Sequence, residues 1–244
     1  AVASDSGFVV TGSTSSYGTG GDMFIVKYAS DGTLSWNKTW GGSGNDYGKS
    51  VAVASDSGFV VTGSTSSYGV SNDMFVTKYS SDGTLSWNKT FGILYVSSNS
   101  IVATTDGGCV VSGYIPGPVE DDLFAFLGKL TTSGTLSWMR TLSDGSSDEN
   151  PDYLNSEAVA TTSDSGLVIA GERSGDVFLA KYASDGTITN CTSLMCHTLT
   201  PTLSSPSATV TTPSATITTP SATVTTPSAT ITSPTMTSTT IVAP

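Results

Sequence analysis

The sequence predicts an all-β chain, built as an array of about four similar four-stranded antiparallel units and followed by an extended non-globular tail. The first observation is an internal repeat of about fifty residues, because residues 3–40 recur at 54–91 with 31 of 38 positions identical. Weaker copies start near Ala103 and Ala160. The second observation is a change of composition near Cys191, after which Thr, Ser and Pro dominate. A repeat of this period indicates stacked units that bury their apolar faces against one another.

Each repeat reads as four short strands, most clearly in the second copy, where we expect them at 49–55, 59–63, 73–79 and 84–91. Val, Phe, Tyr, Trp and Thr fill the strands, and Gly, Asp, Asn and Ser fill the gaps between them. The third strand is apolar on both faces, which is typical of a strand between two neighbouring sheets. The fourth alternates, so we expect one of its faces to meet water. Four antiparallel strands in about fifty residues describe a β-propeller blade.

The repeat carries a motif of turns and strands that ends on a Trp. In the first copy its residues are Asp5, Phe8, Asp22, Lys27, Asp31, Gly32 and Trp36, and in the second they include Asp56, Asp73, Asp82 and Trp87. The third copy keeps Trp138, whereas the fourth has Asn190 in that place. This motif resembles the β-propeller repeats of large bacterial and archaeal extracellular proteins. The resemblance covers about 1–191 and implies the fold, but it says little about function because that family is defined by its scaffold.

The expected organisation is a set of blades, a linker and a tail. The blades are placed at 1–47, 48–97, 98–153 and 154–190, the linker at 191–200 and the tail at 201–244. Four blades are fewer than most propellers have. They form a small ring, belong to a longer propeller, or close against another subunit. An open set would leave sheet edges exposed, so we expect self-association. Because residue 1 falls inside a repeat, we also expect a further segment to precede it.

Composition excludes some partners. Asp and Glu total 20 against 9 Lys and Arg, for a net charge of −11, which argues against nucleic acid or an anionic membrane as partner. Only 12% of residues are charged, and Ser, Thr, Asn and Gly supply the polar surface. That composition suits a secreted or surface-displayed β protein. The sequence contains no run of eighteen apolar residues, so we expect no membrane insertion by this segment.

The tail contains four successive heptads of the form Pro-Ser-Ala-Thr-Val/Ile-Thr-Thr/Ser, starting at Pro206, and 31 of its 44 residues are Thr, Ser or Pro. A Pro at every seventh position forbids a helix and interrupts any central strand. Ser/Thr-rich composition with Pro is typical of an O-glycosylated, mucin-like stalk. The O-glycosylation candidates lie in the heptads: Ser207, Thr209, Thr211, Thr212, Ser214, Thr216, Thr218, Thr219, Ser221, Thr223, Thr225, Thr226, Ser228, Thr230 and Thr232.

The alternation of Val and Ile along the heptads has two interpretations. One is tandem duplication with drift. The other is a two-faced ribbon, because an odd period on an extended strand places successive heptads on opposite faces. Val210 and Val224 would then share one face, and Ile217 and Ile231 the other.

Three sequons predict N-glycosylation, at Asn37, Asn88 and Asn190. We expect the first two on the polar face of the fourth strand of a blade, and the alternative is that Asn-Lys-Thr is simply good edge-strand sequence. Cys191 and Cys196 are close enough for a small disulfide loop in an oxidising compartment. The alternatives are two free thiols, or zinc bound together with His197.

Other candidates have structural interpretations beside functional ones. Cys109 stands where other repeats have Phe or Leu, so we expect a buried apolar residue. The loop Asp144–Asp152 holds four acids and is either a calcium site or a solvated acidic loop. The pairs Asp22/Lys27, Asp73/Lys78 and Asp176/Lys181 could form one site per blade, or could be a loop-closing Asp and a Lys that extends along its strand.

The sequence offers no catalytic residues and no cofactor site. Its only His is His197, in the linker, so no Ser-His-Asp set can be assembled within the blades. The first functional hypothesis is a secreted, glycosylated structural protein that self-associates into an extracellular fibre, stalk or surface layer. The alternative is a propeller module that binds carbohydrate or a surface protein through loop aromatics: Tyr17, Tyr47, Tyr68, Tyr95 and Tyr114.

Overall fold

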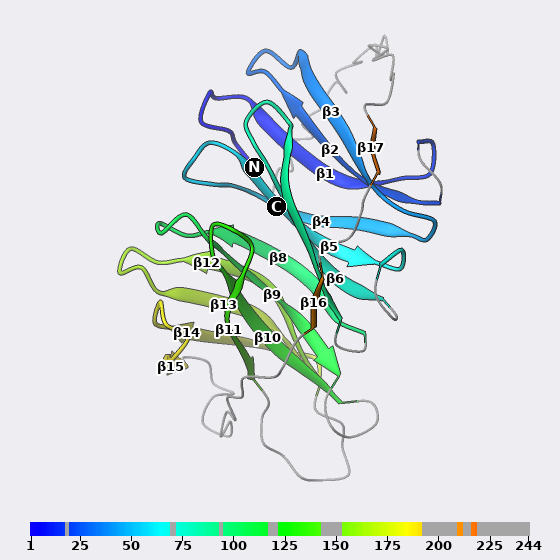
Figure 1. The fold of residues 1–244 in the computed structure, drawn as a ribbon. Helices are drawn as coiled ribbons and strands as arrows, with labels where there is room; N and C mark the ends of the chain where they lie inside the picture. The colour runs from blue at the N-terminus through cyan, green and yellow to red at the C-terminus, as the bar shows by residue number, and fades with distance from the viewer. Residues whose placement is uncertain are drawn as a thin grey trace, which may run out of the picture.

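The computed structural model describes residues 1–17, 20–68, 72–92, 95–116, 122–142, 153–191, 209–211 and 216–218. All regular elements in these ranges are β-strands, and they form four antiparallel sheets that follow one another through the molecule (Figure 1). The predicted all-β array of four repeated sheets is confirmed.

Each repeat contributes the strands of one sheet. The first sheet contains β1 (Phe8–Thr14), β2 (Asp22–Tyr28) and β3 (Leu34–Gly41). The second contains β4 (Asp46–Val53), β5 (Phe59–Thr65), β6 (Asp73–Tyr79) and β7 (Leu85–Gly92). The third contains β8 (Ser97–Ala103), β9 (Cys109–Pro116), β10 (Leu123–Leu130) and β11 (Leu136–Leu142). The fourth contains β12 (Leu154–Thr161), β13 (Leu167–Arg173), β14 (Asp176–Tyr182) and β15 (Ile188–Cys191).

Two short strands of the tail extend the first two sheets. β16 (Thr209–Thr211) pairs with β7, and β17 (Thr216–Thr218) pairs with β3. The first sheet therefore has four strands and the second has five. On the inner side of the first sheet, Val2 forms a single bridge to Phe8 rather than a full strand.

The tight turns follow from their Asp, Ser and Gly residues. In the turn before β5, the Asp56 carboxylate accepts a hydrogen bond from the Gly58 N–H at 2.9 Å. Ser57 takes the positive φ of 62°, a conformation that a short polar side chain tolerates. Gly58 is needed for a different reason, because a Cβ there would lie 2.4 Å from the Tyr79 carbonyl oxygen.

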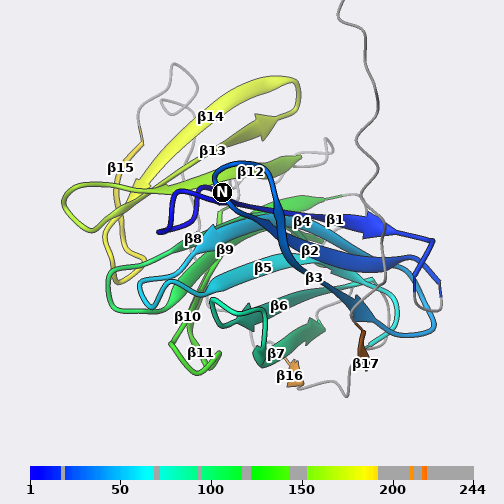
Figure 2. The same cartoon turned by 90° about the horizontal axis from the view of Figure 1, so that it is seen from above.

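The innermost strands β4, β8 and β12 lie side by side near the middle of the array (Figure 2). Each carries a β-bulge at the same place in its repeat, between Gly48 and Ser50 in the second sheet, which bends the strand and increases its twist. Serine hydroxyls at the bulges join neighbouring sheets. The Ile101 N–H donates to Ser50 Oγ at 3.2 Å, and the same contact recurs between the third and fourth sheets.

Three apolar clusters hold the array together, one between each pair of successive sheets. Among the described residues, strands of the first and fourth sheets do not pack against each other in this way. The array is therefore open, with one sheet face uncovered at each end (Figure 1). This outcome selects the open arrangement among the alternatives that the sequence left.

Candidate assembly surfaces

The contact between successive sheets is a repeated arrangement of two faces. We call the face toward the next sheet the forward face and the face toward the preceding sheet the backward face. Between the first two sheets, Trp40 of the forward face packs on Phe75 of the backward face, with ring centroids 4.4 Å apart. Both side chains are fully buried. The apolar residues of the repeat thus serve mainly to join sheets.

The repeated Trp and the repeated turn Gly fasten each sheet to the next. The indole N–H of Trp36 donates to the Ser81 carbonyl at 3.1 Å, and a Cβ on Gly83 would lie 2.8 Å from the indole ring. Three such pairs occur: Trp36 with Gly83, Trp87 with Gly134, and Trp138 with Gly186. The motif residues Asp-Gly and Trp therefore act between blades. The fourth sheet has Asn190 at the Trp position and lacks this fastener on its forward side.

The backward face of the first sheet is uncovered. Phe8 is 38% exposed and Val10 is 42% exposed, whereas their equivalents Phe59 and Val61 are 1% and 0% exposed. No atom lies within 4 Å of a Cβ added to Gly32, the first-sheet equivalent of Gly83. The place that a preceding Trp would occupy is open.

A hollow of about 250 Å³ on this backward face is lined in part by Tyr17 and Phe24. Their equivalents in the second sheet, Tyr68 and Phe75, both contact Trp40, with ring centroids 5.2 and 4.4 Å away. The hollow is therefore the seat of an apolar side chain from a neighbouring outer strand.

The forward face of the fourth sheet is uncovered in the complementary sense. Val177 is 73% exposed, whereas Met23 at the same position of the first sheet is 0% exposed. The Lys181 side chain is 38% exposed, compared with 5% for its equivalent Lys27. The two ends of the array thus present the two halves of the contact that recurs inside it.

The tail strands occupy outer edges of the array, farthest from the innermost strands. Val210 of β16 lies opposite Phe91, and Ile217 of β17 lies opposite Trp40, which holds the same place in its sheet. The two-faced ribbon is therefore wrong for these heptads. Val210 and Ile217 hold equivalent positions on successive sheets, because each heptad reaches a new sheet rather than continuing one straight strand.

The repeated Lys residues pair with a different Asp from the one expected. Each third-strand Lys bonds the Asp of the turn that precedes the second strand, not the Asp that begins its own strand. The pairs are Lys27–Asp5, Lys78–Asp56, Lys129–Asp106 and Lys181–Asp164. The expected pairs Asp22/Lys27, Asp73/Lys78 and Asp176/Lys181 are therefore wrong. In an antiparallel hairpin the two ends of a seven-residue strand lie far apart, so a Lys near one end meets the turn beside it.

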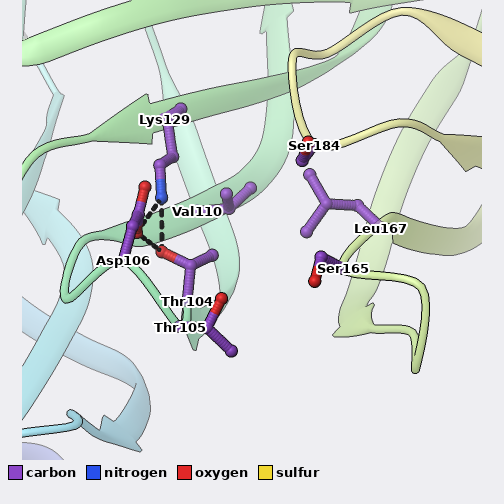
Figure 3. Close-up of a pocket in the computed structure, with 8 residues that line it drawn as sticks. All are labelled: Thr104, Thr105, Asp106, Val110, Lys129, Ser165, Leu167 and Ser184. Atoms are coloured by element: carbon purple, nitrogen blue, oxygen red, sulfur yellow. Dashed lines mark hydrogen bonds and ion pairs between the residues drawn. The ribbon is translucent and has the colours of Figure 1, made fainter.

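One of these ion pairs lines a hollow of about 230 Å³ between the third and fourth sheets (Figure 3). Lys129 donates to Asp106 at 2.7 Å and to the Thr104 hydroxyl. The bond from Lys129 lowers the pKa of Asp106 to about 2. Leu167 and Ser184 face the pair across the hollow. The charged groups on this wall are paired with each other, which indicates a structural role.

Two carboxylates meet at the junction of the first two sheets. Asp46 is fully buried and accepts hydrogen bonds from the Thr65 and Ser67 hydroxyls. Asp22 is 4% exposed, and its Oδ1 has no hydrogen-bond partner. A Cβ on Gly41 would lie 2.2 Å from Asp22 Oδ1 and 2.6 Å from Asp46 Oδ2. Burial raises the pKa of Asp22, and the charge of Asp46 adds to the effect.

Sequence reasoning missed Asp46. Its equivalent in the third sheet is Ser97, so Asp46 breaks the repeat at a buried position. A comparison of the copies at that position could have found it.

The first two sequon asparagines do not face water. Asn37 is 8% exposed and Asn88 is 7% exposed, which corrects the expectation that both lie on a solvated face. Asn88 stands opposite Thr77 on the backward face of the second sheet, which the first sheet covers. Glycosylation at these positions stays a prediction and would require modification before the sheets pack.

The remaining sequence-predicted sites have mixed outcomes. Cys109 is buried, as expected, and burial raises the pKa of its thiol to about 12. Asn190 and Cys191 lie in β15, and Thr209, Thr211, Thr216 and Thr218 lie in the tail strands. Cys196, His197, the Asp144–Asp152 loop and the other O-glycosylation candidates lie outside the described residues.

The loop aromatics divide into exposed and packed residues. Tyr47 is 45% exposed and Tyr95 is 61% exposed. Tyr68 instead packs on Trp40 and donates a hydrogen bond to the Gly41 carbonyl at 2.7 Å. Tyr68 is therefore part of the contact between sheets.

Comparison with known proteins agrees with the architecture. A family model described as "Domain of unknown function (DUF5122) beta-propeller" matches residues 8–34, which contain β1, β2 and the turn that follows. No curated protein matches the chain. None of the described residues forms a helix with the length and apolar character of a membrane span. The four repeated sheets and the family match together identify the chain as a β-propeller repeat protein.

Proposed function

We propose that this chain is a secreted or cell-surface structural protein whose copies associate into an extracellular fibre, stalk or surface layer. The observation that carries the proposal is the pair of uncovered end faces, which are the two halves of one repeated contact. A forward face that binds the backward face of another copy is a heterologous contact. It closes into a ring if the rotation allows, and otherwise continues as a filament.

The expected association is weaker than the contacts inside the chain. Full burial of a side chain such as Phe8 contributes about 1.5–3 kcal/mol. However, the fourth sheet offers Asn190 in place of the Trp fastener and Val177 in place of Met. Copies with a net charge of −11 also repel one another. We therefore expect reversible association that strengthens as salt screens the repulsion.

Sedimentation velocity over a range of protein and salt concentrations tests the proposal. The double variant Phe8→Ser/Val10→Ser removes apolar surface from the backward face and should weaken association. Tyr47→Ser is the matched control, since it removes an exposed aromatic from β4 of the second sheet. A wild-type chain that stays monomeric at every concentration and salt would rule out the structural role.

Extracellular location and glycosylation of the tail belong to the same proposal. They are supported by the low charge content and by the Thr, Ser and Pro of the heptads. Intact-mass measurement before and after deglycosylation of material from the natural source tests them. A mass of 24.9 kDa with no added sugar would remove the stalk from the proposal.

A second candidate is a carbohydrate- or protein-binding module, favoured by the exposure of Tyr47, Tyr95 and Tyr153. Exposed aromatic rings are common anchors in recognition. A glycan array probed with the chain tests this role. Binding that is lost in Tyr95→Ser would favour recognition over assembly.

A further inference from the structure

The two tail strands obey one register rule. Thr216 pairs with Gly41 and Thr209 pairs with Gly92. A step of seven residues back along the tail therefore matches a step of 51 residues forward through the sheets. The heptad length is accordingly set by the spacing of successive outer edges.

The physical basis is completion of open sheet edges. An outer strand such as β3 or β7 has a row of backbone groups with no partner on its outer side, and an added strand satisfies them. Three extended residues fit between prolines, because Pro is tolerated only at edges and strand ends. The heptad thus supplies one short strand and one link to the next sheet.

Two complete heptads, 220–226 and 227–233, follow β17 in the sequence. The rule places Thr223–Thr225 one sheet beyond the first sheet, on its uncovered backward side. In the head-to-tail contact proposed above, the sheet at that place is the fourth sheet of a second copy. Its outer strand β15 ends its sheet among the described residues, where the strand order is β12-β13-β14-β15.

We infer that the heptad 220–226 donates a strand to β15 of the neighbouring copy. Each copy then covers outer edges of its own sheets and one edge of its neighbour. This inference rests on the proposed association and goes further, because it makes the tail a linker between copies.

The chain offers a matched pair of variants, since 206–212 and 220–226 have the same sequence. Thr223→Pro/Val224→Pro removes two consecutive N–H groups from the donated strand. Successive N–H groups of a strand point to opposite sides, so one of the two must face the partner. Thr209→Pro/Val210→Pro makes the identical change in β16. Sedimentation velocity and thermal unfolding of the whole chain are measured for both.

We expect Thr223→Pro/Val224→Pro to weaken association by about tenfold, the value of one or two hydrogen bonds, and to leave the monomer's unfolding midpoint unchanged. Thr209→Pro/Val210→Pro should lower that midpoint and weaken association less. Unchanged association in the first variant, while Phe8→Ser/Val10→Ser still weakens it, overturns the inference and leaves the proposed function standing. A wild-type chain that never associates overturns both.

Discussion

The first and second sheets have nearly the same sequence, yet the same residues do different work in them. Phe59 is 1% exposed because the first sheet covers it, whereas Phe8 is 38% exposed because no sheet lies in front of it. Gly83 supports the ring of Trp36, whereas Gly32 supports nothing. In a repeat array, the role of a residue is therefore set by the neighbour that covers it as much as by its own sequence.

The largest test of this comparison is a matched pair of truncations. Phe59→Ala leaves a cavity between two sheets and should cost about 3–5 kcal/mol of unfolding free energy. Phe8→Ala should cost less than about 1 kcal/mol in the monomer, because much of that side chain is already in water. Urea unfolding at low protein concentration measures both. Equal costs would mean that the first sheet is covered in solution.

A pair of glycine substitutions sharpens the same comparison. Gly32 and Gly83 have positive φ of 84° and 83°, so an Ala at either position is strained by about 1–2 kcal/mol. Only at Gly83 would the Cβ meet an indole ring, at 2.8 Å, and this overpacking should add about 1–3 kcal/mol. Thermal unfolding of the two variants should show the larger drop for Gly83→Ala, and a reversed order would contradict the role of the Trp fastener.

The ion pairs give a pH-dependent version of the test. The pKa of Asp106 is lowered to about 2 in the fold, below its unfolded value of about 3.9. Its contribution is therefore complete above about pH 4 and is lost as pH falls through about 2. Asp106→Asn should cost about 1–2 kcal/mol at neutral pH, because it strands a buried Lys. It should also flatten the acid limb of the stability curve.

Asp164→Asn is the control for this effect, since Lys181 is 38% exposed compared with 9% for Lys129. Water screens the exposed pair, so the loss should be smaller. Equal losses in the two variants would show that burial of the Lys does not matter.

The smallest expected effect concerns the acidic pair between the first two sheets. The pKa of Asp22 is raised, so its ionised form opposes folding at neutral pH, and stability increases as pH falls toward that raised pKa. Asp22→Asn should stabilise the fold at pH 7 by about 0.5–1 kcal/mol. Asp73→Asn is the control and should not stabilise, because Ser97 stands where Asp46 would be. A loss of stability in Asp22→Asn would contradict this account.

The strands were predictable where local pattern decides them. The expected strand 73–79 coincides with β6, because a run apolar on both faces has only one interpretation as a strand between sheets. β4 begins at Asp46, three residues before the expected 49. Asp46 and Tyr47 pair with Thr65 and Ser64, and the bulge that follows hides this pairing from the alternation of the sequence.

The errors about sites came from contacts between sheets. Asn88 looked solvated because its strand alternates, but the alternation cannot show that another sheet covers the polar face. Lys27 was assigned to Asp22 because the two are close in sequence, whereas its partner Asp5 lies across a turn and a strand. The uncovered faces were equally hidden, since Phe8 and Phe59 have the same neighbours in sequence.

The most direct measurement is oxidative footprinting of side chains in dilute and concentrated chain, read by mass spectrometry. Labelling of Phe8 and Val177 should fall as copies associate. Phe59 should stay protected throughout, and Tyr47 should stay reactive. Association that leaves Phe8 and Val177 fully reactive would contradict the claim that the two end faces are the surfaces by which copies of this chain join.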